Sequence, residues 1–425
     1  MNDKLKPDNA NVAVIGAGYV GLVTGVCLAK LGHEVVLIDI DEDKIQAVNH
    51  KKAPPIYEEG LEELLGQVNI EASSDYRKMM GSDIIYICVG TLADDSGNIF
   101  SEHLIDATRK IAEVLKERDN YYVVAVKSTV GPGMTEELVI PILEASGKKA
   151  GSDFGVCMSP EFLREGQAIY DFMNPSRIII GEYDKRSGDI LCSIHESLNA
   201  PILRTNLRTA EMIKLATNAF LATKISFINE IGNICKQLGI DTYDVARGMG
   251  MDDRIGSKFL SAGIGFGGSC LPKDIRILVS GAKQAGYQPE FLEEISTLNE
   301  KQALKPVALL KKHITLKGAT VGILGLAFKP GTDDIRDSRA IIIVQALLDE
   351  GASVSAYDPL AVDNFRKLFP GIDYVSTEEV LSCDAILILT EWPEFYDLDY
   401  RGKIVIDGRR IEKAREARIY EGVCW

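Results

Sequence analysis

The residues with the clearest chemical potential lie in one glycine-rich segment, Gly263–Asp274, which reads GIGFGGSCLPKD. Cys270 follows four glycines, and Lys273 and Asp274 come three and four residues after it. Glycines allow a backbone to approach a ligand closely, and a thiol beside a lysine is readily ionised and nucleophilic. An aspartate one helical turn further on could act as a base. The segment therefore predicts covalent catalysis at Cys270, in preference to a buried structural cysteine.

The other cysteines carry no comparable pattern. Cys424 lies at the end of the sequence and receives no role. The sequence has no CxxC pair and its five histidines do not cluster, so it predicts neither a disulfide framework nor a metal site. A buried structural role is expected for the six that lie in apolar runs, Cys27, Cys88, Cys157, Cys192, Cys235 and Cys383.

Two polar clusters follow expected strands, at the sheet edge where α/β proteins bind ligands. Lys127-Ser128-Thr129 closes one strand, and Ser159–Gly166 (SPEFLREG) follows another. In the second cluster, Glu161 and Glu165 could serve a site or could form the solvated start of a helix. Their spacing does not decide between these two roles.

A third cluster lies on a long helix expected over residues 206–238, which contain no proline and one glycine. Lys214 and Asn218 are four residues apart and share one face of this helix, so they could serve a site together. The alternative is that they simply lie on the solvent-exposed face of the helix. The helix would reach roughly 45–50 Å, more than the width of a small domain. Such a helix is expected to join two domains, and its apolar stripe often forms a dimer interface. The apolar residues at helical spacing are Met212, Leu215, Ala219, Ala222 and Ile225.

The first part of the sequence has the pattern of a dinucleotide site. An expected strand, Asn11–Ile15, leads directly into the turn GAGYVG and an apolar helix, and Asp39 closes the next strand. In this pattern Gly16 permits the tight turn, Gly18 lets the backbone approach the pyrophosphate, and Gly21 lets helix and strand pack closely. Asp39 would bind the ribose hydroxyls and repel a 2′-phosphate, which favours NAD over NADP. An ordinary glycine turn is the alternative.

Strands and helices alternate around this turn, which predicts a parallel sheet covered by helices on both faces. The expected strands cover residues 34–39, 84–89, 122–126, 154–158 and 177–180, and the expected helices cover 22–31, 102–117 and 134–145.

The alternation of strands and helices recurs from residue 319, with strands expected over 319–324 and 353–357 and a helix over 339–350 between them. The segments KLGHEVVLID and DEGASVSAYD both run from a helix end through a glycine and a strand to an acid, which indicates an internal repeat. The second turn, Gly325–Pro330, lacks the full glycine fingerprint and fits a ligand other than the dinucleotide.

The fold prediction is an α/β protein with two Rossmann-like parallel-sheet domains joined by a long central helix. The expected domains are residues 1–205, which bind the dinucleotide, residues 206–312, which are helical and form a dimer, and residues 313–425, which form the second Rossmann-like domain.

Composition excludes several classes of function. The chain has 425 residues and a formal net charge of −15, which argues against a nucleic-acid partner but not against an anionic small molecule. No apolar run approaches the roughly 20 residues needed to span a bilayer. Residues 1–10 hold no apolar signal-peptide core. No membrane partner and a cytoplasmic location are therefore expected.

Together these segments resemble the UDP-glucose/GDP-mannose dehydrogenase family, from Gly16 through Arg409. The motif PEFLREG, with its glycine at position 166, resembles the UDP-glucose branch of this family. Two residues depart from the family pattern: Ser159 stands where Asn is common, and Leu92 stands where Pro is common. Both positions adjoin the expected site. The matching stretches are GAGYVG, VGT (89–91), KSTV (127–130), PEFLREG (160–166), KLATNAF (214–220), GFGGSCLPKD (265–274), FKPGTDD (328–334) and DGRR (407–410).

The resemblance implies a four-electron oxidation, in which the primary alcohol of a nucleotide sugar becomes a carboxylate at the expense of two NAD and one water. Cys270 would capture the aldehyde as a thiohemiacetal, and a thioester would then form and be cleaved by water. Asp274 and Thr129 would handle protons and position the water. Glu161 would be the base of the hydrolytic step.

The resemblance also implies the binding residues. Lys214 and Asn218 would stabilise oxyanions at the reacting carbon. Arg254 would come from a neighbouring subunit, so a complete site would need a homodimer or a higher homo-oligomer. The implied cofactor contacts are Gly16, Gly18, Tyr19, Val20, Gly21, Asp39, Lys44, Thr91, Ser128, Glu165, Lys273 and Arg336. The implied substrate contacts are Phe162, Leu163, Lys214, Asn218, Arg254, Phe266, Gly267, Lys329 and Arg409.

Several functions fit these residues. Oxidation of UDP-glucose to UDP-glucuronate is favoured, with residues 313–425 binding the UDP-sugar, and a dehydrogenase of GDP-mannose or of a UDP-N-acetylhexosamine is the near alternative. A single-step β-hydroxyacid dehydrogenase also joins a Rossmann domain to long helices, but it needs no nucleophilic cysteine. A non-enzymatic NAD-binding sensor would not need Glu161, Lys214 and Cys270 together.

Overall fold

The computed structural model describes residues 9–54, 56–94 and 97–425, which form two compact units. The first unit comprises the chain up to Ala216 together with Arg276–Gly281, and the second comprises Thr217–Ile275 and Ala282–Trp425. Among the described residues, no helix combines the length and apolar character needed to cross a membrane. The expected division into three domains stays a prediction.

The first unit is built on an eight-stranded sheet with the order β10-β9-β8-β7-β4-β1-β2-β3. The sequence predicted a parallel sheet, and six of the seven neighbouring pairs are parallel, but β8 and β9 run antiparallel, with Cys157 opposite Glu182. The strands are β1 (Asn11–Ile15), β2 (Glu34–Ile38), β3 (Ile70–Ser73), β4 (Ile84–Ile87), β7 (Val123–Val126), β8 (Gly155–Met158), β9 (Ile178–Glu182) and β10 (Ile202–Thr205). A separate hairpin joins β5 (Leu92–Ala93) and β6 (Ile99–Phe100).

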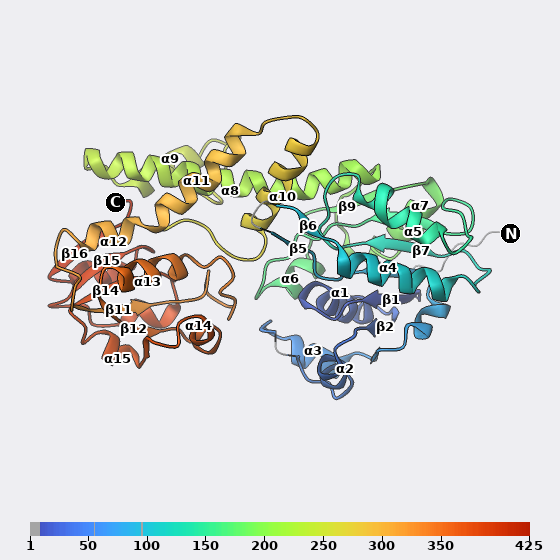
Figure 1. The fold of residues 1–425 in the computed structure, drawn as a ribbon, viewed down its shortest axis with the longest axis horizontal. Helices are drawn as coiled ribbons and strands as arrows, with labels where there is room; N and C mark the ends of the chain where they lie inside the picture. The colour runs from blue at the N-terminus through green and yellow to red at the C-terminus, as the bar shows by residue number, and fades with distance from the viewer. Residues whose placement is uncertain (1–8, 55, 95–96) are drawn as a thin grey trace. The chain divides into compact units, whose positions relative to one another are not determined.

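Helices cover both faces of this sheet, as Figure 1 shows. Successive side chains of a strand point to opposite faces, so Val12 and Val14 of β1 join one hydrophobic cluster and Ala13 and Ile15 join another. Helices α1 (Tyr19–Lys30), α3 (Leu61–Gln67), α6 (Ala168–Met173) and α7 (Lys185–Ser193) contribute to the first cluster. Helices α4 (Glu102–Leu115) and α5 (Ile140–Glu144) contribute to the second. Helix α2 (Glu42–Asn49) follows β2, and a π-helical turn, η2 (Thr135–Val139), precedes α5.

The predicted long helix is present as α8 (Leu207–Leu238), with 32 residues that correspond to roughly 48 Å. Its residues from Thr217 onward belong to the second unit. The expected apolar stripe is mostly a core face, because Leu215, Ala219 and Ala222 are buried. A different stripe is exposed: Phe220 (64%), Phe227 (48%), Ile234 (49%) and Leu238 (67%).

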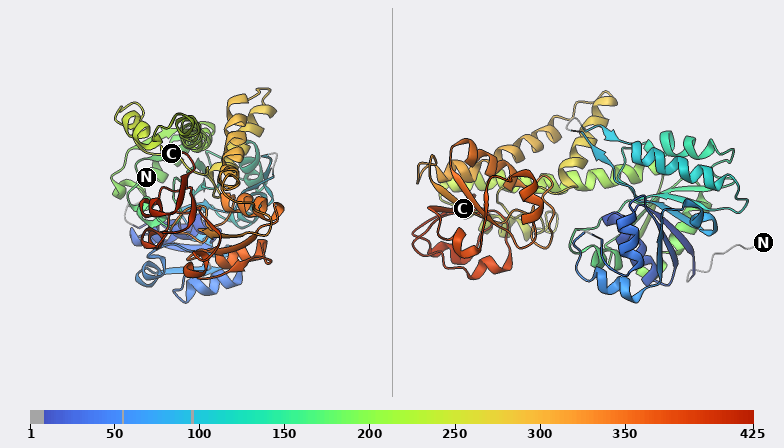
Figure 2. Two further views of the ribbon diagram at one scale, coloured as in Figure 1. Left: turned by 90° about the vertical axis from the view of Figure 1, so that its left-hand side faces the viewer. Right: turned by 60° about the horizontal axis from the view of Figure 1, so that its bottom comes forward.

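The second unit contains a six-stranded sheet in which all pairs are parallel, with the order β13-β12-β11-β14-β15-β16. The strands are β11 (Thr320–Leu324), β12 (Ser353–Tyr357), β13 (Asp373–Tyr374), β14 (Ala385–Ile388), β15 (Ile404–Asp407) and β16 (Ile419–Gly422). Helices α13 (Arg339–Asp349), α14 (Val362–Leu368) and α15 (Thr377–Val380) alternate with them. Figure 2 shows this sheet and its helices in orange to red.

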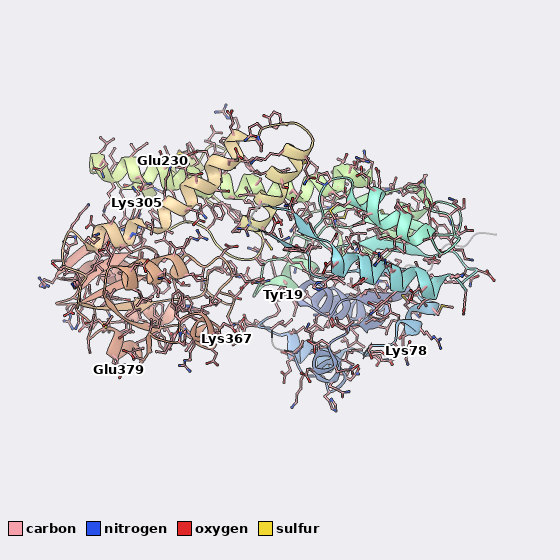
Figure 3. The ribbon with its side chains drawn as sticks, in the orientation of Figure 1. Tyr19, Lys78, Glu230, Lys305, Lys367 and Glu379 are labelled. Carbon is pink, nitrogen blue, oxygen red and sulfur yellow. The ribbon has the colours of Figure 1, made fainter. Side chains whose placement is uncertain are left out.

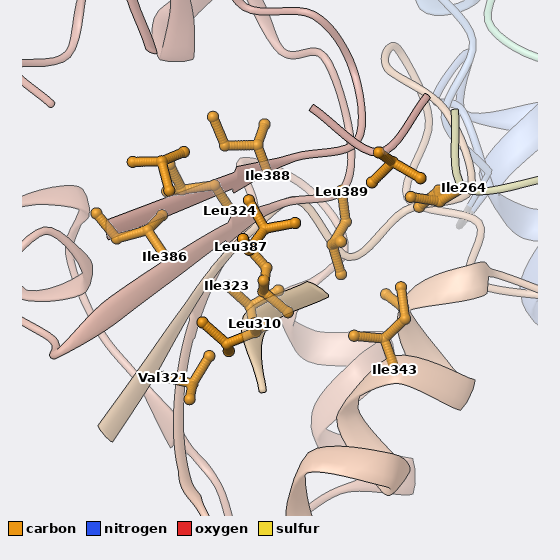
Figure 4. Packing of buried hydrophobic residues seen from close by; sticks show 14 of the residues in the cluster. Ile264, Leu310, Val321, Ile323, Leu324, Ile343, Ile386, Leu387, Ile388 and Leu389 are labelled. Atoms are coloured by element: carbon orange, nitrogen blue, oxygen red, sulfur yellow. The ribbon is translucent and has the colours of Figure 1, made fainter. Parts of the chain in front are cut away.

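Four more helices belong wholly or partly to the second unit: α9 (Thr242–Gly250), α10 (Leu271–Gln284), α11 (Glu290–Ala303) and α12 (Lys305–Leu310). One hydrophobic cluster joins α12, α13 and the strands of the second sheet. Figure 4 shows part of this cluster, with Ile264 of the glycine-rich segment at one end.

Candidate functional site

The turn between β1 and α1 has the geometry that the glycine pattern predicts. Gly16 has a φ of +98°, and a Cβ there would lie 2.9 Å from the carbonyl oxygen of Cys88. A Cβ on Gly21 would lie 1.8 Å from the Gly16 carbonyl oxygen, so helix and turn pack closely only with glycine. A Cβ on Gly18 would meet no atom within 4 Å. The space at Gly18 is therefore open in front of the α1 N-terminus, which fits a diphosphate group.

Asp39, at the end of β2, accepts hydrogen bonds from the Ala17 N–H at 2.5 Å and the Asp41 N–H at 2.9 Å. The side chain is partly exposed, so it has room for a further ligand. Lys44 pairs with Asp41 at 3.3 Å in the first turn of α2. The carboxylate thus faces the backbone turn that holds Gly16 and Gly18, as the dinucleotide pattern requires.

The repeat in the second unit has the same turn geometry, but the acid at the end of its second strand is enclosed by protein. Gly325 has a φ of +95° and its N–H donates to the Tyr357 carbonyl at 2.8 Å, as Gly16 does to Ile38 at 2.7 Å. Asp358 takes the position of Asp39 but is fully enclosed at 2% exposure. Its donors are the N–H groups of Leu326, Ala327, Leu360 and Ala361 and the indole of Trp392. Asp358 is saturated by protein donors, so this repeat is not a second dinucleotide site.

Tyr19, labelled in Figure 3, connects the glycine turn to the segment after β8. Its hydroxyl donates to Glu58 and accepts from the Gly166 N–H at 2.7 Å. Glu58 in turn accepts from the Ile169 N–H at 3.0 Å. Burial, followed by the Glu58 contact, raises the pKa of Tyr19, and Glu165 adds to the effect. Glu58 was missed at the sequence level because it lies 39 residues from Tyr19 outside any motif.

The segments that follow β4 and β7 are tied together by two hydroxyls. Ser128 Oγ donates to the Val89 carbonyl at 2.7 Å, and Thr91 Oγ1 donates to the Thr129 carbonyl at 2.7 Å. Ser128 and Thr91 are both buried. Since β4 and β7 are neighbouring parallel strands, these bonds hold Thr129 at their common edge.

Lys214 and Glu161 form a buried ion pair. Lys214 Nζ lies 2.7 Å from Glu161 Oε1 and also donates to the Glu161 carbonyl at 2.8 Å, while the Leu163 N–H donates to Oε2 at 2.6 Å. Burial favours the neutral carboxyl, but the charge and hydrogen bond of Lys214, the Leu163 N–H and the charge of Lys127 outweigh it and lower the pKa of Glu161. Glu161 is therefore an ionised, anchored carboxylate and not the solvated start of a helix.

Phe162 lies beside this pair, and two cations lie near its ring. The Arg177 guanidinium is 4.0 Å from the ring centroid, and Lys214 Nζ is 5.5 Å from it. The aromatic face thus adds a favourable contact to Lys214. Burial lowers the pKa of nearby Lys127, whose Nζ lies 3.5 Å from the Ser159 carbonyl.

In the second unit, Asn218 and Asp274 meet at the start of α10. Asn218 Nδ2 donates to Asp274 Oδ2 at 2.6 Å, and Lys273 Nζ lies 3.0 Å from Oδ1. The Asp274 N–H donates to the Cys270 carbonyl at 2.9 Å, which makes Cys270 the residue that begins the helix. The N-terminal end of a helix favours a negatively charged group. Cys270 is partly exposed, and Ser269 Oγ is 3.5 Å from its sulfur.

The glycines before Cys270 make room for protein. A Cβ on Gly263 would lie 2.6 Å from the Gly408 carbonyl oxygen, one on Gly267 would lie 2.3 Å from that of Asp337, and one on Gly268 would lie 2.7 Å from the Phe328 ring. The sequence reasoning expected these glycines to make room for a ligand. Close packing against neighbouring loops of the second unit accounts for these three.

That packing brings several implied substrate and cofactor residues to the loop. The Gly268 N–H donates to the Arg336 carbonyl at 2.9 Å, although the Arg336 side chain is 59% exposed and pairs with Asp334. Arg409, next to Gly408, donates from Nε to the Leu389 carbonyl at 2.6 Å. Phe266 is buried within the loop. Lys329 is half-buried, with Nζ 5.8 Å from the Phe328 ring centroid.

Arg254 is placed apart from these residues. Its side chain is 88% exposed and pairs with Asp252 at 2.6 Å.

All eight cysteines are free. Burial raises the pKa of Cys88, of Cys27 and of Cys424 to about 12. It also raises the pKa of Cys157, Cys192 and Cys383 above the ordinary thiol value. These thiols are poor nucleophiles, which agrees with a structural role for those in apolar runs.

Comparisons with known proteins place this geometry in a family. Three profiles of the UDP-glucose/GDP-mannose dehydrogenase family match the chain: the NAD-binding domain over residues 10–199, the central domain over 208–301 and the UDP-binding domain over 322–414.

Individual relatives match nearly the whole chain. The UDP-glucose 6-dehydrogenase AglM of Haloferax volcanii is 43% identical, with 97% of this chain and 99% of the relative covered. The GDP-mannose 6-dehydrogenase of Pseudomonas aeruginosa is 37% identical over 97% of this chain and 100% of its own. A UDP-glucose dehydrogenase structure from Pyrobaculum islandicum superposes with a TM-score of 0.94 at 40% identity, with 98% of each chain covered. With its glycine turn, buried Lys214–Glu161 pair and Cys270 loop, the chain belongs to the UDP-glucose/GDP-mannose dehydrogenase family.

Proposed function

We propose that the chain catalyses the NAD-dependent oxidation of UDP-glucose to UDP-glucuronate. The observation that carries the proposal is a full-length match at 43% identity to a UDP-glucose 6-dehydrogenase, together with ion-paired Glu161 and a partly exposed Cys270 at a helix start. The reaction consumes two NAD and one water, and it releases two NADH and the acid.

NAD fits the first unit, because the α1 N-terminus is open at Gly18 and Asp39 closes β2 beside it. Tyr19, Val20 and Gly21, in the first turn of α1, are also assigned to NAD binding. When bound, NAD would supply the hydride acceptor for each of the two oxidations, with a separate NAD molecule for each. Lys44, Thr91, Ser128, Glu165, Lys273 and Arg336 are the further contacts that we assign to it.

The chain's own groups manage charge and protons in both oxidations. In the first, the alcohol loses its proton to Asp274, and Lys214 and Asn218, which lie one turn apart on the same face of α8, stabilise the negative oxygen. The Cys270 sulfur then adds to the aldehyde carbon, and the same two groups hold the new oxyanion. The adduct is necessary because a bare aldehyde has no alkoxide to expel a second hydride.

Hydrolysis of the thioester releases the acid. Glu161 is ionised at neutral pH, since its pKa is lowered by Lys214, and it takes a proton from the attacking water. Asp274, held by Asn218 and Lys273, and Thr129 position that water and carry protons. The sulfur leaves as thiolate at the N-terminal end of α10.

We assign the binding of the sugar nucleotide mainly to cationic and aromatic side chains. The sugar-nucleotide contacts that we assign, following the family resemblance, are Phe162, Leu163, Arg254, Phe266, Gly267, Lys329 and Arg409. Their cations explain how a chain with a net charge of −15 binds a diphosphate. We assign the UDP moiety to residues 313–425 and the dinucleotide to residues 1–205, with residues 206–312 as the dimerisation domain. A cytoplasmic location fits these substrates.

Parallel assays with UDP-glucose, GDP-mannose and UDP-N-acetylglucosamine test the choice of sugar. We expect NADH production at low substrate concentration with UDP-glucose alone. A higher kcat/KM with GDP-mannose would place the chain with relatives such as the Pseudomonas aeruginosa enzyme and overturn the assignment.

Cofactor choice tests the role of Asp39. The variant Asp39→Ala should bind NAD more weakly by about 1.5–3 kcal/mol, because a charged hydrogen bond to the ribose is lost. It should also accept NADP better, because the repelling charge is gone. The measurement is the ratio of kcat/KM for NAD and NADP, with exposed Glu42→Ala as the matched control. An unchanged ratio would remove Asp39 from the site.

The enzyme acts as a homodimer in this proposal. The exposed residues Phe220, Phe227 and Ile234 repeat every seven positions on α8, which is the spacing of a helix–helix interface. Arg254 is 88% exposed and thus available to a second copy.

Complementation between inactive variants tests the shared site. Arg254→Ala should lose affinity for UDP-glucose while NAD binding survives, and Cys270→Ala should lose the acid-forming step. After subunit exchange, random mixing leaves about one site in four with both residues intact. We therefore expect activity to return to roughly that fraction on mixing. Absence of rescue, with exchange confirmed by mass, would mean that each chain builds its site alone.

A further inference from the structure

Three buried amide side chains hold the loop that leads to Cys270. Asn229 of α8 and Asn299 and Gln302 of α11 are 3%, 4% and 3% exposed. We call these three residues the amide cradle. They bond to backbone groups of Gly263 and Phe266, which lie at the two ends of a four-residue stretch of that loop.

Each end of the stretch is fixed by both a donor and an acceptor. Asn299 accepts from the Phe266 N–H at 2.8 Å and donates to the Phe266 carbonyl at 2.9 Å, as a neighbouring strand would. Gln302 donates to the Gly263 carbonyl at 2.6 Å, and Asn229 accepts from the Gly263 N–H at 2.8 Å. Asn233 donates to Gln302 Oε1 at 2.9 Å and orients that amide.

The residues between these ends are fixed as well. Ile264 is buried in the core of the second unit, where Figure 4 shows it. Gly265 has a φ of +103°, and a Cβ there would lie 2.5 Å from Asn299 Oδ1. The loop is therefore clamped between an apolar core and the amide cradle, and its path toward Cys270 is set.

Amides suit this task for a physical reason. An amide presents a donor and an acceptor side by side, so one side chain can satisfy both backbone groups of a residue without a buried charge, as Asn299 does for Phe266. None of these bonds stabilises a regular element, because Gly263 and Phe266 lie outside helices and strands. The bonds fix a loop whose exit carries the thiol.

We propose that the amide cradle, and Asn299 above all, is a set of positioning residues for Cys270. The inference rests on the proposed function in one respect, namely that Cys270 is the nucleophile. Covalent capture needs the sulfur at the aldehyde carbon, and a misplacement of about 1 Å costs on the order of 100-fold in rate. The cradle acts through the backbone and touches no reacting atom.

A small cleft beside the cradle makes a selective test feasible. It has a volume of about 100 Å³ and is lined by Asn229, Asn299 and Gln302, and also by Glu230 and Lys305, which Figure 3 labels. Water can enter a polar space of this size and replace bonds lost on truncation. Variants of the cradle should therefore fold while the loop loses its fixed path.

The test compares Asn299→Ala, Asn299→Asp and the control Glu230→Ala, an exposed residue of the same cleft. In Asn299→Ala, kcat with UDP-glucose should fall on the order of 100-fold, while KM for NAD stays at the wild-type value. Asn299→Asp keeps the acceptor for the Phe266 N–H and should recover part of that loss. Glu230→Ala should match the wild type. A folding defect would instead impair both kcat with UDP-glucose and KM for NAD.

A second readout does not depend on activity. Alkylation of Cys270 by iodoacetamide, followed by peptide mass mapping, should be several-fold faster in Asn299→Ala because the loop has lost its clamp. If Asn299→Ala does not fold, Asn299→Asp and Gln302→Glu are measured in its place. Wild-type rates of both turnover and alkylation in the folded variants would overturn the inference. An inactive wild type with altered alkylation in the variants would overturn the proposed function alone.

Discussion

Replacement of Cys270 with alanine should abolish formation of UDP-glucuronate while nucleotide binding persists. The first oxidation needs an alkoxide and a hydride acceptor, but the second needs a tetrahedral adduct, which we propose that the Cys270 sulfur supplies. We expect the acid-forming rate to fall by at least about 10⁴-fold, as for other nucleophiles that act as part of a unit. Ion exchange separates the product, which carries one more negative charge than the substrate.

The matched control is Cys383→Ala, a half-buried thiol in the same unit whose pKa is raised by burial. It should keep wild-type activity. Cys270→Ser is a sharper variant, because a hydroxyl can form a hemiacetal but its ester is cleaved poorly in a site shaped for a thioester. Acid production should stall in that variant. Full acid production by Cys270→Ala would exclude the covalent route.

The second large effect concerns the buried Lys214–Glu161 pair. Lys214→Ala should lower kcat on the order of 100- to 1,000-fold, since our proposal assigns Lys214 as an oxyanion-stabilising donor. It should also destabilise the fold by about 3–5 kcal/mol, because Glu161 is left as an uncompensated buried charge. Thermal or denaturant unfolding measures the second effect independently of activity.

The double variant Lys214→Met, Glu161→Gln separates the two effects. Removal of both charges should restore much of the stability lost in Lys214→Ala, but not the activity. If the double variant is as unstable as Lys214→Ala, the loss of stability does not come from an unpaired charge. Activity in the double variant would show that neither group is needed for the chemistry.

The pair also predicts a pH dependence of stability. Since the pKa of Glu161 is lowered in the folded state, the pair's contribution is fully present above the ordinary carboxyl value of 4.5 and is lost as pH falls through the lower folded value. The wild type should therefore lose stability relative to the double variant as the pH falls below about 4.5. If the free energy of unfolding depends on pH in the same way in both proteins, that result would contradict a lowered pKa for Glu161.

Local patterns predicted the main elements of the fold well. The first strand was expected and found at Asn11–Ile15, and the long helix expected over 206–238 runs from Leu207 to Leu238. The direction of β9 was predicted wrongly, because an apolar run in the sequence carries no information about the direction of the strand in the sheet. The helix expected over 134–145 begins as the π-helical turn η2, which no spacing rule distinguishes from an α-helix.

The roles of the predicted site residues stay predictions, and the contacts that the structure gives them could not be read from the sequence. The sequence left Glu161 between a functional carboxylate and a solvated helix start, and only its 2.7 Å contact with Lys214 decides between them. Tyr19 was assigned through its motif, yet its partner Glu58 lies 39 residues away. The amide cradle went unnoticed because Asn299 and Phe266 are 33 residues apart in sequence and meet through tertiary packing.

One measurement tests the covalent four-electron mechanism most directly: the number of NADH molecules formed per UDP-glucose when the sugar nucleotide is limiting and NAD is in excess. In our proposal Cys270 holds the intermediate between the two oxidations, so the wild type should release two NADH per sugar with no free aldehyde, and every sugar should end as the acid. A yield of one NADH per sugar, with aldehyde as the product, would contradict the mechanism and place the chain among single-step dehydrogenases.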